Sequence, residues 1–122
     1  MISIFKSVTL HTNRLSELKS FYQYILEMSL IEDGVDGFTL RVGSSTLNFK
    51  ASHLQAAYHF AFNIHGNHMA EAKKWLQERV ELNREDGNDE MYYESFDADA
   101  IYFDDPAGNV FEFLCGVTKV GV

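Results

Sequence analysis

Hydrophobic and polar residues alternate along most of this chain in short runs, and in two stretches the hydrophobic residues recur instead every three or four positions. Alternation predicts β-strands with one buried face, and the longer spacing predicts amphipathic helices. In the first half, the pattern predicts a strand, a helix capped by Asn13 and three further strands. These cover residues 4–12, 15–26, 29–32, 38–42 and 46–50.

The second half repeats this plan of a strand, a helix and three strands. The expected elements cover residues 58–64, about 68–79, 91–96, 100–103 and 110–114. Asn67 is the expected cap of the second helix. We therefore expect one α+β domain made of two βαβββ modules, at about residues 1–52 and 57–117. Because sheets twist, the strands should form a cupped mixed sheet with the helices on its convex side.

The buried faces of the two helices follow from the same spacing. In the first helix, the residues expected to face the core are Leu15, Leu18, Phe21, Tyr22, Ile25 and Leu26. In the second helix, they are Met69, Ala72, Leu76 and Val80.

The strands carry small and polar residues on the face that points away from the helices, because side chains alternate across a strand. A cup formed by these faces would be lined by Ser7, Thr9, His11, Asn48, His59, Tyr102 and Glu112. A hollow of this kind is the expected place for a small-molecule ligand.

Glu112 is the most informative residue of the last strand, because its face neighbours Val110 and Leu114 are hydrophobic. An ionised carboxylate among apolar groups needs a cation, a proton or several hydrogen-bond donors. His59, on the strand that opens the second module, offers a matching imidazole. Two interpretations stay open: His59 and Glu112 bind a metal ion together, or they hydrogen-bond each other.

The negative charge of the chain is concentrated in one segment. The net charge is −8, and residues 81–99 contain eight acidic residues against one arginine. This segment is either a solvated acidic loop or a rim that attracts a cationic ligand. Nucleic acid is not an expected partner, because the phosphate backbone requires a basic surface.

The cysteine content and the lack of long hydrophobic runs indicate the cellular compartment of the protein. The single cysteine, Cys115, excludes an internal disulfide and a cysteine-rich zinc site. No hydrophobic run reaches the length of a membrane span, and the first residues do not form a secretory leader. We expect a cytoplasmic protein with no membrane partner.

Two motifs resemble those of the vicinal oxygen chelate superfamily, which includes glyoxalases, bleomycin-resistance proteins and extradiol dioxygenases. The segment from Phe103 to Glu112 resembles the pattern F-x-D-P-x-G-N-x-x-E, and the segment from Leu15 to Tyr22 resembles the start of that family's first helix. The resemblance covers nearly the whole chain. It implies paired βαβββ modules, a homodimer, and, in metal-using members, ligands from the first and last strands of each module.

Carried over position by position, the resemblance gives two matching ligands and two departures. Glu112 matches the closing glutamate and His59 the histidine that opens the second module. The histidine expected in the first strand falls on Ser7, and the glutamate expected at the end of the first module falls near Asn48. His11 lies roughly 13 Å further along the first strand, so it should line the cup rather than replace the lost histidine.

The resemblance implies two functions. The first is a glyoxalase-like or dioxygenase-like protein, of the lyase, isomerase or dioxygenase kind, that binds a small oxygen-bearing molecule. A weak zinc, nickel, manganese or iron site at His59, Glu112, Ser7 and Asn48 would then act as Lewis acid, Glu112 as proton-transfer base and Tyr102 as hydrogen-bond donor. The alternative is a metal-free, bleomycin-resistance-type protein that sequesters a cationic molecule.

Overall fold

The computed structural model of the chain describes residues 7–54, 56–64, 68–94 and 98–116. Both halves have the order of one strand, one helical segment and three strands. The first half contains β1 (Ser7–Thr12), α1 (Leu15–Ser20), η1 (Phe21–Ile25), β2 (Ser29–Gly34), β3 (Gly37–Val42) and β4 (Ser45–Ala51). The second half contains β5 (His59–Asn63), α2 (Met69–Gln77), β6 (Met91–Tyr93), β7 (Ala98–Asp104) and β8 (Val110–Gly116).

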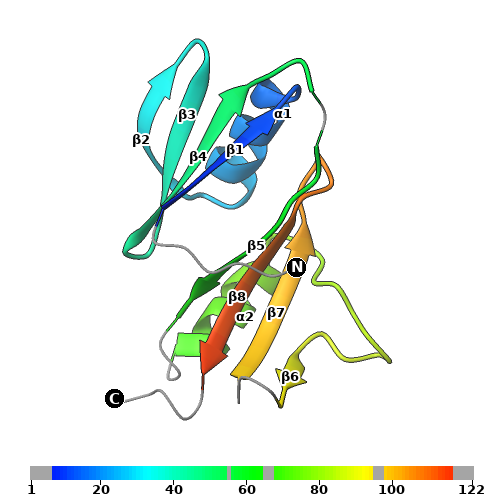
Figure 1. The fold of residues 1–122 in the computed structure, drawn as a ribbon. Coiled ribbons are helices and arrows are strands. Elements are labelled where there is room, and N and C mark those ends of the chain that lie inside the picture. The colour runs from blue at the N-terminus through cyan, green and yellow to red at the C-terminus, as the bar shows by residue number, and fades with distance from the viewer. Residues whose placement is uncertain (1–6, 55, 65–67, 95–97, 117–122) are drawn as a thin grey trace.

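The strands form two four-stranded sheets, one for each half. Their orders are β1-β4-β3-β2 and β5-β8-β7-β6. In each sheet the first and last strands of the half pair in parallel, and the other neighbours pair antiparallel. Figure 1 shows α1 behind the first sheet and α2 behind the second, so both helices lie on the same side of the molecule. The predicted α+β fold of two βαβββ modules is confirmed, with one sheet per module.

The first helix differs from its prediction at both ends. Asn13 does not cap it, because the cap position is Arg14, whose backbone N–H donates to the Thr12 hydroxyl at 3.0 Å. Its last turn is a π-helix, in which the N–H of Leu26 donates to the carbonyl of Phe21. This wider turn moves Ile25 out of the helical repeat, and its side chain is 49% exposed rather than buried.

The second helix is shorter than predicted. It covers Met69–Gln77, with Met69 and Leu76 buried and Ala72 half-buried. Val80 lies beyond the end of the helix and is half-buried. The predicted cap, Asn67, lies outside the described residues. None of the described helices is long and apolar enough to cross a membrane.

The two modules share one aromatic core centred on Phe111. Its ring stacks on Phe103 with centroids 4.9 Å apart, and lies 5.3 Å from Phe60 and 5.4 Å from Phe62. Tyr22, from the first module, approaches the same ring at 6.2 Å. Aromatic packing of this kind joins the helical segment of one module to the sheet of the other.

Asp105 explains why the motif between β7 and β8 has its particular residues. One carboxylate oxygen accepts the backbone N–H groups of Ala107 and Asn109, at 2.9 and 3.0 Å. The other accepts the Asn109 side-chain amide and the Tyr22 hydroxyl, both at 2.8 Å. Gly108 has φ +82°, which favours glycine in this turn. The motif is therefore a buried clamp between the β7–β8 turn and the helical segment of the first module.

Candidate functional site

The face of the second sheet that points away from the helix carries small residues around one carboxylate. Strand register places Glu112 of β8 between Ala61 of β5 and Tyr102 of β7. Ala100 and Leu114, one step further along the same face, are also buried. Glu112 itself is fully buried, at 0% exposure, although it points away from the helix side of the sheet.

His59 is the hydrogen-bond partner of this carboxylate. Its Nε2 lies 2.7 Å from Oε1 of Glu112, and the imidazole is 31% exposed while the carboxylate is not exposed at all. The second carboxylate oxygen, Oε2, is buried and forms no hydrogen bond within the described part of the chain. Burial raises the pKa of Glu112, and the hydrogen bond from His59 opposes this shift. The structure thus holds a buried carboxylate that is hydrogen-bonded to a partly exposed histidine.

Two tyrosines flank this dyad. The Tyr102 ring meets the His59 ring edge-on, with centroids 6.0 Å apart. The Tyr102 hydroxyl is hydrogen-bonded to the hydroxyl of Tyr93 on β6. Burial, and then the hydrogen bond with Tyr93, raise the pKa of Tyr102. Tyr102 therefore stays protonated at neutral pH and can act only as a neutral hydrogen-bond donor or acceptor.

On the first sheet, the polar residues form a separate network around Asn48. Its amide nitrogen donates to the Thr9 hydroxyl at 3.2 Å, to the Ser7 hydroxyl at 3.3 Å and to the carbonyl of Val8 at 3.1 Å. Its amide oxygen accepts the Thr39 hydroxyl at 2.7 Å. Asn48 thus joins β1, β4 and β3 through its side chain.

The predicted site residues therefore fall into two groups. His59, Glu112 and Tyr102 lie together on the second sheet, and Ser7, Thr9 and Asn48 lie together on the first. No hydrogen bond or ion pair between described residues joins the two groups.

His11 pairs in register with Lys50 and is exposed, apart from both groups. Sequence reasoning missed Tyr93 and Thr39. Their only signal was their place on the polar face of a strand, and their partners depend on strand register, which the pattern does not give.

Comparisons with known proteins bear on the fold. No protein-family model and no curated protein sequence matches the chain. A lactoylglutathione lyase from Agrobacterium tumefaciens matches it in structure with a TM-score of 0.71 and 15% identity, over 93% of each chain. An integron cassette protein from the mobile metagenome of Halifax Harbour sewage outfall gives 0.73 and 22%, over 93% of this chain and 97% of that chain. The fosfomycin resistance protein FosX from Listeria monocytogenes gives 0.64 and 20%, over 96% of each.

The chain has the vicinal oxygen chelate fold. Identities of 15–22% show a shared architecture and leave the activity open.

Many proteins of the vicinal oxygen chelate fold hold a divalent metal, and the donors that the structure describes in this chain do not complete a site for one. Divalent transition metals are usually held by three or more protein ligands. The described residues contain no group of three or more His, Cys, Asp or Glu side chains that could hold an ion. Only His59 and Glu112 come together, while the oxygen of Asn48 accepts Thr39 and its nitrogen cannot ligate.

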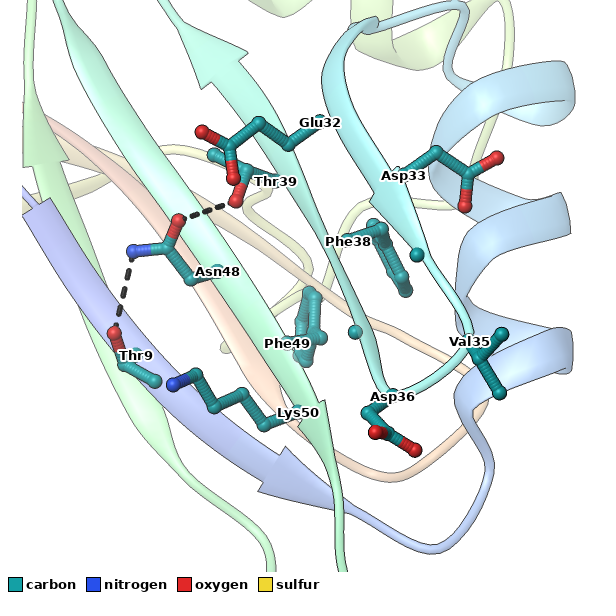
Figure 2. A pocket seen from close by; sticks show the side chains of 12 residues that line it. Thr9, Glu32, Asp33, Val35, Asp36, Phe38, Thr39, Asn48, Phe49 and Lys50 are labelled. Carbon is teal, nitrogen blue, oxygen red and sulfur yellow. Dashed lines mark hydrogen bonds between the residues drawn. The ribbon is translucent and has the colours of Figure 1, made fainter.

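A groove of about 800 Å³ lies beside the β2–β3 hairpin of this vicinal oxygen chelate fold. Figure 2 shows Glu32, Thr39, Asn48 and Thr9 in a row across the sheet, with Asn48 hydrogen-bonded to both threonines. The volume falls within the ordinary range of small-molecule pockets. The groove also contains the acidic residues Asp33 and Asp36 and one cation, Lys50.

The acidic segment of residues 81–99 is partly neutralised by α2. Nζ of Lys73 lies 2.8 Å from the Asp89 carboxylate and 3.3 Å from that of Glu90. Gln77 donates a further hydrogen bond to Asp89 at 3.0 Å. The hydrogen bond from Lys73 holds the pKa of Asp89 below its ordinary value, and the same bond raises the pKa of Lys73. Asp89 and Glu90 are therefore each held in an ion pair with Lys73.

Replacing Lys73 by methionine is expected to lower the free energy of unfolding by about 1 kcal/mol at neutral pH. Since the folded-state pKa of Asp89 lies below 3.8, its stabilisation is present above pH 3.8 and is lost as the pH falls through the folded value. Urea denaturation between pH 2 and 7 should show the two proteins converging at the acid end. Lys74→Met, at an exposed position on the same helix, should change stability by less than half as much.

Proposed function

We propose that the protein binds a small oxygen-bearing molecule against the second sheet, and that His59 accepts a proton from it. The observation that carries this proposal is the 2.7 Å contact between a partly exposed imidazole and a fully buried carboxylate. A buried carboxylate with one orphaned oxygen is costly to keep in a fold. Groups of this kind are concentrated at functional sites.

The chemistry follows from which ring nitrogen is engaged. Nε2 of His59 faces Glu112, whereas Nδ1 forms no hydrogen bond to any described residue. A carboxylate on one ring nitrogen fixes the tautomer and leaves the other nitrogen as proton acceptor. Glu112 is then a positioning residue, and Tyr102 supplies a neutral donor for a ligand oxygen near the imidazole. This arrangement suits proton transfer next to a carbonyl, as in lyase or isomerase reactions.

The structural comparisons support a small-molecule function. The solved structures of this fold include a lactoylglutathione lyase and a fosfomycin resistance protein, whose names refer to small oxygen-rich compounds. Because the donors in the described part of the chain do not complete a metal site, no step of the proposal passes through a metal ion. The homodimer implied by the family resemblance stays a prediction.

A second function is favoured by the groove beside the β2–β3 hairpin. Glu32 and Asp36 line it without an ion pair to any described residue, while Asp33 pairs with Lys19 at 2.5 Å. Two unpaired carboxylates in a groove of about 800 Å³ suit a cationic molecule, as the metal-free sequestration alternative requires. Lys50, on the same groove, opposes this charge and makes it the weaker candidate.

His59→Ala is expected to weaken binding of small vicinal-oxygen probes by at least tenfold, or about 1.4 kcal/mol. Catechol, hydroxyacetone and glycolate would be titrated separately into isotope-labelled protein and followed by NMR. Shifts should be centred on His59, Tyr102 and the strands that carry them. Glu112→Gln should also weaken binding, by a smaller factor, because an amide still accepts the imidazole proton.

His11→Ala is the matched control, because His11 is an exposed histidine on the other sheet. It should leave probe binding unchanged. Equal losses in both histidine variants, or shifts from none of the probes, would contradict the proposal. Binding of spermidine that weakens with salt and with Glu32→Gln would instead favour cation sequestration.

A further inference from the structure

We infer that the first-sheet positions expected to ligate a metal have become an internal hydrogen-bond lock, so that the His59–Glu112 dyad works without a divalent ion. This inference concerns the same dyad as the proposed function and rests on it. Its test measures metal binding and not ligand binding, so the inference and the proposed function can fail independently of each other.

The lock is the network around Asn48. Every polar atom of its side chain is engaged: the oxygen accepts Thr39, and the nitrogen donates toward Ser7, Thr9 and the Val8 carbonyl. These partners come from the strands on either side of β4. Turning the amide oxygen toward an ion would break the 2.7 Å bond from Thr39 and leave the nitrogen without its acceptors.

Ser7 is held in the same way. Its hydroxyl oxygen lies 2.8 Å from the Thr46 hydroxyl, which donates to it, and 3.3 Å from the amide nitrogen of Asn48. A hydroxyl oxygen has two lone pairs, and two donors lie within hydrogen-bond distance of this one. The position where the fold's metal-using relatives are expected to place a histidine is thus filled by a residue whose acceptor capacity is used within the sheet.

On the second sheet, the side chains of His59 and Glu112 form a hydrogen bond with each other. A separation of 2.7 Å between Nε2 and Oε1 is the length of a charge-assisted hydrogen bond, which engages one ligating atom of each side chain. An ion that binds both of these atoms would have to break this bond. The titratable groups that face Glu112 are His59 from β5 and Tyr102 from β7, and the Tyr102 hydroxyl is bonded to Tyr93. Of the other described residues on this face, Ala61, Ala100, Val110 and Leu114 offer no ligand atom from their side chains. Asn63 and Asp104 lie one step away from Glu112 along the neighbouring strands, and the Asp104 carboxylate accepts a hydrogen bond from Asn83.

The test adds Zn²⁺ or Ni²⁺ alone, with a matched EDTA sample, to the full chain and follows thermal unfolding. The wild type, His59→Ala and His11→Ala should each change by less than about 1 °C between metal and EDTA. A bound ion at a hundred times its dissociation constant would stabilise the native state by about 2.7 kcal/mol and raise the midpoint by several degrees. Such a rise in the wild type and His11→Ala, absent in His59→Ala, would overturn the inference.

A second measurement keeps the inference falsifiable if His59→Ala does not fold. Long-range ¹⁵N–¹H spectra report which ring nitrogen of His59 carries the proton. We expect a protonated Nε2 in the wild type at pH 7, unchanged by equimolar Zn²⁺, and altered in Glu112→Met, where the acceptor is gone. Loss of the Nε2 proton on addition of Zn²⁺, with the signals of His11 unmoved, would show that an ion enters between the two side chains.

Discussion

Asp105→Ala is expected to lower the free energy of unfolding by about 3 to 4 kcal/mol, a large part of the stability of an ordinary domain. The carboxylate accepts four hydrogen bonds, from Tyr22, Ala107 and two groups of Asn109. Its removal leaves these donors without an acceptor in a site where Asp105 is only 5% exposed. Urea denaturation followed by tryptophan fluorescence and by far-ultraviolet circular dichroism measures the change.

Asp104→Ala is the matched control, because it removes the neighbouring carboxylate from the surface. Asp104 is exposed and accepts one hydrogen bond, from Asn83 at 3.0 Å. Its loss should cost less than about 1 kcal/mol. A similar effect for both variants would mean that the clamp between the β7–β8 turn and Tyr22 contributes nothing beyond an ordinary surface contact.

Phe111→Ala is expected to cost about 4 kcal/mol, because it opens a cavity where the two modules meet. The ring is fully buried and lies between Phe103, Phe60 and Phe62, with Tyr22 of the first module at 6.2 Å. The neighbouring rings are held by β5, β7 and the helical segment of the first module, so they cannot collapse freely into the space. The same denaturation experiment should show one cooperative transition at a lower urea concentration.

Phe113→Ala tests whether position in the core, rather than loss of a phenyl ring, sets the cost. Phe113 follows on the same face of β8 but is only half-buried. We expect a loss of about 2 kcal/mol, in proportion to the smaller apolar area that it buries. Equal losses for Phe111→Ala and Phe113→Ala would contradict the assignment of Phe111 as the centre of the shared core.

Hydrophobic periodicity was enough to predict the order and type of the elements, because each strand and helix buries one face. The same periodicity predicted the ends of the elements less accurately, because these ends depend on local hydrogen bonds. Arg14 takes the cap position expected for Asn13, with its backbone amide donating to the Thr12 hydroxyl, and a π-turn from Phe21 moves Ile25 outward. Neither the hydroxyl bond nor the wider turn has a signature in the spacing of hydrophobic residues.

The candidate site was predictable where it depended on alternation along one strand. The position of Glu112 among hydrophobic residues indicated a paired carboxylate, and His59 is its partner at 2.7 Å. Alternation does not give the register between strands, so the contacts of Asn48 with Thr39 and of Tyr102 with Tyr93 were not foreseen. These contacts join residues within each sheet, and whether the two sets act as one site stays a prediction.

The parallel pairing of first and last strands affects how each half is formed in time. Ser7 pairs with Thr46, and His59 pairs with Val110, so the chain must close long loops before either pair gains a hydrogen bond. Loop closure costs entropy that only later contacts offset, and a high contact order slows folding. During that delay the apolar strands stay exposed to solvent. The newly made polypeptide is therefore most prone to aggregation before these parallel strand pairs form.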